Sequence, residues 1–123
     1  MAELIYKELS FQIVGALYEV YNQLRYGHPE KIYQRAFANE LSKRKIPFQK
    51  ELYYPIIFKG NRIGNYYLDF LVENKVVVEL KVTNDFYQKE INQMLGYIKA
   101  KKYRLGILAL FTKKGIKYRR VLN

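Results

Sequence analysis

The chain has 123 residues, of which half are hydrophobic, and this length and composition favour one domain over residues 1–123. It contains no cysteine, which excludes disulfides, thiolate metal sites and a cysteine nucleophile. The 22 lysines and arginines outnumber the 11 acidic residues, and no acid follows Glu90, so we expect a polyanionic partner such as nucleic acid. Because no apolar run approaches the ~20 residues of a membrane span and no signal peptide is visible, we expect a cytoplasmic protein without membrane contact.

The first third of the sequence has the spacing of two helices. In SFQIVGALYEVYNQL, residues 10–24, apolar side chains recur three and four positions apart, with Ser10 as candidate N-cap and Gly27 as candidate end. A second helix is predicted from Pro29 to the basic residues 43–45. Its core-facing residues are predicted to be Tyr33, Ala36, Phe37 and Leu41.

From residue 49 onward the apolar period becomes that of strands. Three strands are predicted in QKELYYPIIF, NYYLDFLV and KVVVELKV, and Pro55 places the first at a sheet edge. An amphipathic helix, YQKEINQMLGYIKAKK, follows, and its core face is predicted to hold Ile91, Met94, Leu95 and Ile98. The last two strands are YRLGILALF, whose apolar residues indicate burial on both faces, and IKYRRVL. Since a strand–helix–strand crossover joins parallel strands, the predicted class is α/β with a mixed sheet.

The two central predicted strands carry charges among their apolar residues. If residues 73–75 form the turn between them, Asp69 lies opposite Glu79, and Lys81 shares the face of Glu79. Facing carboxylates repel each other unless a cation lies between them, and hard divalent ions take oxygen ligands of this kind. The spacing alone is compatible with a metal site and also with a structural ion pair between Asp69 and Lys81.

These charged residues carry a resemblance to a known superfamily. The pattern D-x9-E-L-K at Asp69, Glu79 and Lys81 resembles the active site of the PD-(D/E)XK nucleases, and the element order from the second predicted helix onward resembles their αβββαβ core. The motif G-x-x-E-x-x-Y at residues 27–33 is similar to that of the GxxExxY family, a small-protein branch of the superfamily. The resemblance implies a restriction-endonuclease-like fold with a mixed central sheet flanked by helices, extended by an N-terminal helix and a short C-terminal strand.

The resemblance also implies a metal site. Asp69 and Glu79 would bind Mg²⁺ or Mn²⁺, and the main-chain carbonyl of Leu80 would supply a third oxygen. Glu30, at the start of the second helix, matches the helical acid of the superfamily and would complete or buffer this site.

Three further residues are implied to act beside the metal. Lys81 would hold the attacking water or stabilise charge on the scissile phosphate. Gln93 and Tyr97 match a Q-x-x-x-Y pattern on the third helix and would position Lys81 or a phosphate. Ordinary helix packing is the alternative role for Gln93 and Tyr97.

The expected function is metal-dependent hydrolysis of phosphodiester bonds, with DNA favoured over RNA. One alternative is a nucleic-acid-binding module that keeps the fold without cutting, and another is an assembly protein whose charge only keeps it soluble. The intact set of Glu30, Asp69, Glu79 and Lys81 favours the nuclease, because a silent site has no reason to retain carboxylates that repel each other. We also expect a homodimer, since one active site cuts one strand and the predicted edge strands offer unpaired backbone.

Overall fold

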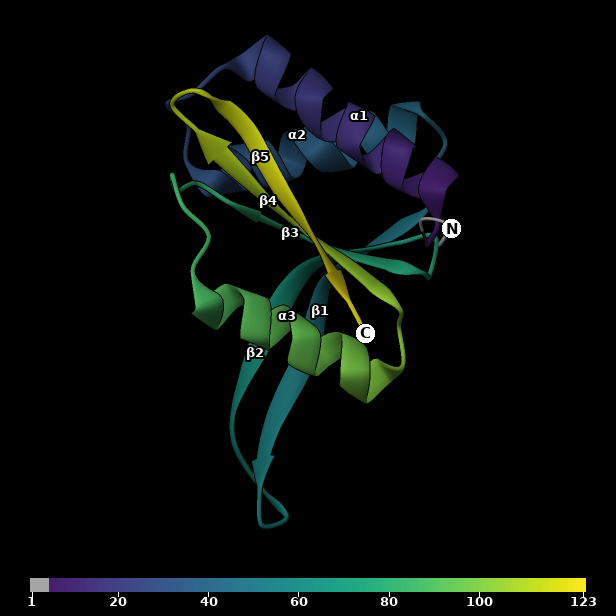
Figure 1. Cartoon of the computed structure of the whole chain (residues 1–123), viewed down its shortest axis with the longest axis vertical. Coiled ribbons are helices and arrows are strands. Elements are labelled where there is room, and N and C mark those ends of the chain that lie inside the picture. Colours follow the sequence, from purple (N-terminus) through teal and green to yellow (C-terminus); the bar gives the residue numbers. More distant parts are fainter. Residues whose placement is uncertain (1–4) are drawn as a thin grey trace, which may run out of the picture.

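A computed structural model describes residues 5–123, which form a mixed sheet with helices on both faces (Figure 1). The elements are α1 (Lys7–Leu24), α2 (Glu30–Lys43), β1 (Phe48–Phe58), β2 (Asn61–Val72), β3 (Val76–Lys81), α3 (Gln88–Lys101), β4 (Leu105–Thr112) and β5 (Gly115–Leu122). The strands lie in chain order, and each neighbouring pair is antiparallel except β3 and β4, which are parallel and joined by α3. This arrangement confirms the predicted α/β class, the restriction-endonuclease-like core and the crossover.

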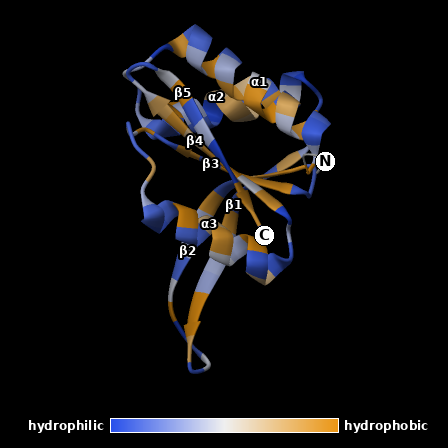
Figure 2. Cartoon of the chain, viewed as in Figure 1, coloured by the Kyte–Doolittle hydropathy of each residue, from blue (hydrophilic) through white to orange (hydrophobic). Residues whose placement is uncertain are grey.

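Two apolar layers hold the helices to the sheet (Figure 2). On one face α1 and α2 pack against the sheet, and the predicted stripe of α2 is buried at Tyr33, Phe37 and Leu41. On the other face α3 packs through Ile91, Met94 and Ile98. Every residue of β4 is buried, as predicted for a strand that is covered on both sides.

Both predicted ends of the first helix are wrong. The helix begins at Lys7, and Ser10 lies inside it, where its buried Oγ accepts a hydrogen bond from the guanidinium of Arg120 at 2.7 Å. The helix ends at Leu24 rather than at Gly27, because Arg25 adopts a left-handed φ of 63° and its N–H donates to the carbonyl of Tyr21.

The two outer strands are β1 and β5, so the edge position predicted from Pro55 is confirmed. The distal halves of β1 and β2 project past α3 as a two-stranded ribbon (Figure 1). Among residues 5–123, no helix combines the length and the apolar character needed to cross a membrane.

Candidate active site

The alternation of side chains along β1 and β2 breaks at Glu51 and Asp69. Leu68 packs with α3, whereas Phe70, two residues later, packs with α1 and α2 on the opposite face of the sheet. A regular strand would place both side chains on one face. Neither Glu51 nor Asp69 is paired in the ladder between the two strands, and Glu51 has a left-handed φ of 57°. The break therefore gives Asp69 an environment that regular strand geometry would not provide.

At the same point β2 separates from β3. Their ladder ends at the pair Phe70–Val78, in the predicted register that places Asp69 opposite Glu79. Beyond that pair, main-chain N–H groups donate to side-chain carboxylates of the opposite strand instead of to main-chain carbonyls. The N–H of Asp69 donates to Oε1 of Glu79 at 2.8 Å, and the N–H of Leu80 donates to Oδ2 of Asp69 at 2.7 Å. Each carboxylate is thereby fixed to the backbone of the opposite strand.

Helix α2 completes the surroundings of Asp69. The side-chain amide of Gln34 donates to Oδ1 of Asp69 at 3.0 Å, and Oε1 of Glu30 accepts a hydrogen bond from the N–H of Val82 at 3.3 Å. Glu30 and Gln34 are one helical turn apart and so share a face of α2. Gln34 is not among the residues predicted from the sequence, although its spacing of four residues from Glu30 is a signal that could have identified it.

The two central carboxyl groups are difficult to ionise. Burial raises the pKa of Glu79 to about 8, and the negative charge of Asp69 adds to the increase, while the ammonium of Lys81 at 3.8 Å opposes it. Burial also raises the pKa of Asp69; the hydrogen bond from Leu80 opposes this increase and the charge of Glu30 adds to it. Within residues 5–123, the only carboxylate paired with Lys81 is that of Glu79, so the ion pair between Asp69 and Lys81 is not formed.

Within residues 5–123, Gln93 and Tyr97 form no hydrogen bond or ion pair with this group. Within the described chain, the hydrogen bonds and ion pairs of Asp69, Glu79 and Lys81 go to other groups. The buried ring of Tyr97 lies 5.4 Å from the ring of Tyr54, centroid to centroid, and 6.2 Å from that of Tyr103. These contacts are those expected of a packing residue, and a role beside the phosphate stays a prediction.

Comparison with known proteins identifies the family. The family model of the PD-(D/E)XK nuclease superfamily matches residues 7–121. The chain belongs to this superfamily. The crystal structure of SSO0001 is similar in fold, with a TM-score of 0.58 and 13% sequence identity over 94% of this chain and 78% of that one. No curated protein sequence matches the chain.

PD-(D/E)XK nucleases generally use divalent metal ions such as Mg²⁺, and the donor set at the carboxylates of this member suits such an ion. Asp69, Glu79 and the carbonyl of Leu80 offer oxygen atoms, which hard divalent cations prefer. The raised pKa values show a buried acidic pair that one lysine does not fully compensate. Within residues 5–123, no three histidine, cysteine, aspartate or glutamate side chains are grouped so as to hold a metal, so Glu30 stands apart from the pair.

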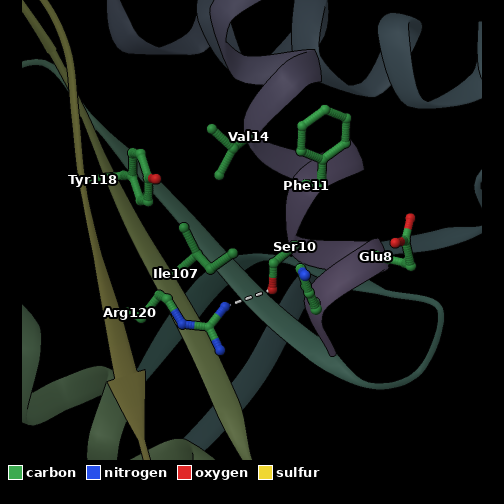
Figure 3. A pocket seen from close by; sticks show the side chains of 8 residues that line it. Glu8, Ser10, Phe11, Val14, Ile107, Tyr118 and Arg120 are labelled. Atoms are coloured by element: carbon green, nitrogen blue, oxygen red, sulfur yellow. Dashed lines mark hydrogen bonds between the residues drawn. The ribbon is translucent and has the colours of Figure 1, made fainter. Parts of the chain in front are cut away.

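Two cavities of this PD-(D/E)XK domain differ in their relation to the carboxylates. A cavity of about 270 Å³ opens beside Asp69, and its lining includes Gln34 from α2. A second cavity of about 440 Å³ lies between the start of α1 and the strands β4 and β5, where Phe11, Ile107 and Tyr118 form its apolar wall (Figure 3). None of the predicted site residues lines the second cavity, whereas Asp69 lines the first.

Proposed function

We propose that this chain is a Mg²⁺- or Mn²⁺-dependent nuclease of the GxxExxY branch that hydrolyses phosphodiester bonds of DNA. The observation that carries the proposal is the reciprocal pair of hydrogen bonds at the gap between β2 and β3, which holds the carboxylates of Asp69 and Glu79 together beside Lys81. Burying two acidic side chains side by side lowers the stability of the fold, so a protein without a function for the pair has no reason to keep it.

These contacts support the proposed roles. Asp69 and Glu79, with the carbonyl of Leu80, would hold the metal ion, and Glu30 would act at the edge of that site. A divalent ion bound there would lower the pKa of a water molecule and offset negative charge at phosphorus. In the reaction, a water molecule gives up a proton as its oxygen bonds to phosphorus, the bond to the leaving ester oxygen breaks, and the leaving oxygen gains a proton.

The remaining side chains position these groups. Lys81 is placed by its 3.8 Å contact with Glu79, where its ammonium would hold the attacking water or stabilise charge on a phosphate oxygen. Gln34 is proposed as a positioning residue, because its amide fixes one oxygen of Asp69 while Leu80 fixes the other. Gln93 and Tyr97 are kept as candidate phosphate-positioning residues on α3. A homodimer that uses the free edge of β5 or β1 would supply the second site needed to cut both strands.

Substitution of the two acids tests this function. We expect Asp69→Asn and Glu79→Gln each to lower cleavage of plasmid DNA in Mg²⁺ or Mn²⁺ by at least about 100-fold, because each removes a metal-binding charge. Glu8→Gln, an exposed carboxylate on α1, is the matched control and should cleave at the wild-type rate. Cleavage that persists in EDTA, or in either acid variant, would contradict the proposal.

A further inference from the structure

The ribbon formed by residues 52–68, here called the arm, exposes large apolar side chains to solvent. At its base Leu52 and Leu68 are buried against α3. Beyond them the arm continues for six residues along β2 to Arg62, or about 20 Å at the rise of a strand. Its distal end exposes more than half of each of three apolar side chains, Ile57, Phe58 and Ile63. Figures 1 and 2 show this ribbon projecting from the rest of the molecule.

One face of the arm is continuous with the surroundings of Asp69. Tyr53 and Tyr67 pair across the strands, with ring centroids 5.6 Å apart, and point away from the face that carries Leu52 and Leu68. Arg62 lies over the same face, where its guanidinium donates to the hydroxyl of Tyr53 at 3.4 Å and to Oδ1 of Asn65 at 3.2 Å. This aromatic and basic face leads along β2 to Asp69.

Helix α2 forms a basic wall beside the base of the arm. Lys31 and Arg35, one turn apart on α2, and Lys50 of β1 line the 270 Å³ cavity that contains Asp69. Among residues 5–123 the ion pairs are Arg44–Glu40 and Lys81–Glu79, so these three cations have no carboxylate partner there. Only Glu51 adds a second acid to the cavity lining.

We propose that the arm and the basic wall of α2 form one binding surface for double-stranded DNA, with the arm in the major groove and Lys31, Arg35 and Lys50 on the phosphates. The proposal rests on the proposed function and adds the form of the substrate. A B-DNA major groove is about 12 Å wide and about 8.5 Å deep, and it admits a two-stranded ribbon. The arm is long enough to fill that depth while Asp69 stays at the sugar–phosphate backbone.

The charge of the arm favours nucleic acid over a second protein chain. No aspartate or glutamate occurs between Glu51 and Asp69, whereas Lys59 and Arg62 lie at the distal end. Within residues 5–123 the hydrogen bonds of the Arg62 guanidinium go to neutral groups, so its charge is available to a phosphate or a guanine edge. The exposed apolar tip suits contact with the thymine methyl groups that the major groove presents. Duplex RNA is disfavoured, because its major groove is too narrow for side chains to read.

Binding measured without catalysis tests the proposal. Fluorescence anisotropy in EDTA would compare a DNA duplex, its single strand and an RNA duplex of the same sequence. We expect wild type to prefer the DNA duplex, and Lys59→Glu with Arg62→Glu to lower that affinity at least about tenfold at 100 mM salt. The control, Lys43→Glu with Lys45→Glu, makes the same charge change at the far end of α2 and should alter affinity less than about threefold.

A second variant separates groove contact from charge. Phe58→Ser with Ile63→Ser keeps the net charge, so we expect weaker duplex binding with an unchanged salt dependence. Equal affinity of arm and control variants, or equal wild-type affinity for the RNA duplex, would overturn the proposal while leaving the nuclease assignment intact. Arm variants that lose self-association in sedimentation but keep DNA affinity would overturn it too, whereas no binding of any nucleic acid by wild type would instead refute the proposed function.

Discussion

Glu79 is a buried carboxyl group whose charged form is disfavoured by its surroundings. Its carboxylate accepts the N–H of Asp69 and contacts Lys81, yet burial and the charge of Asp69 still raise its pKa to about 8. The metal-free protein therefore binds a proton at neutral pH where a metal-bound protein would hold a cation. Metal binding near pH 7 should consequently release protons.

The pH dependence of stability follows from this raised pKa. Glu79 stabilises the metal-free fold fully below its unfolded value near 4.5, and this contribution is lost as pH rises through about 8. We expect the free energy of unfolding in EDTA to fall from pH 5.5 to pH 8.5 by an amount on the order of a few kcal/mol. Urea denaturation of wild type and Glu79→Gln measures this, and the variant should lose markedly less. An equal loss in both proteins would show that Glu79 does not govern the change.

At the scale of elements, β2 serves two structures that regular strand geometry would not combine. Its C-terminal part, up to Val72, lies in the central sheet, and its N-terminal part forms one side of the arm. The change of face occurs at Asp69, so the same irregularity creates the acid site and the base of the arm. Helix α3 supports this arrangement by packing Met94 against Gly106 of β4.

The contact between α3 and β4 depends on Gly106. A Cβ atom there would lie 2.4 Å from Sδ and 2.8 Å from Cγ of the buried Met94, so the Met94 side chain, or α3 with it, would have to shift. We expect Gly106→Ala to lower the free energy of unfolding by about 1–3 kcal/mol in urea denaturation. Gly64→Ala is the control, because no atom lies within 4 Å of its added Cβ and the change should stay within about 0.5 kcal/mol. Similar losses in both variants would contradict the steric explanation.

At the scale of the whole molecule, the basic C-terminal third is folded back toward the acid site. The parallel strands β3 and β4 end at one edge of the sheet, and the turn after β4 contacts the segment after β3. There the N–H of Lys113 donates to Oδ1 of Asn84 at 3.4 Å, and the ammonium of Lys117 donates to the main-chain carbonyl of Asn84 at 2.9 Å. Positive charge that is distant in sequence thus lies beside Asn84, three residues after Lys81 in the chain.

Charge reversal at this edge tests its part in binding. We expect Lys113→Glu, Lys114→Glu and Lys117→Glu together to weaken binding of different DNA sequences about equally, because phosphate contacts carry no sequence information. The slope of log affinity against log salt should become shallower by about 0.9 for each phosphate that the variant no longer neutralises. A control that reverses Lys43, Lys45 and Lys75 makes the same charge change elsewhere and should retain most of the affinity. Unchanged affinity in the first variant would place the binding surface on another face.

The sequence by itself determined the α/β class, the order of elements and the register of Asp69 against Glu79. These features depend on local properties, namely the period of apolar residues and the length of the 73–75 turn. Local reasoning failed at Ser10, whose hydroxyl is bonded to Arg120, a partner 110 residues away.

Only the tertiary structure decided how the site is built around that register. The side-chain amide of Gln34 donates to Asp69, which lies 35 residues later in the chain. Lys81 pairs with Glu79 rather than with Asp69. The ring of Tyr97 packs with the rings of Tyr54 and Tyr103. The tertiary structure also produced the change of face at Glu51 and Asp69, which joins the candidate site and the arm in one hairpin. The physical reason is that contacts between distant segments depend on how whole elements pack, and the free energy of that packing is not contained in any local pattern of residues.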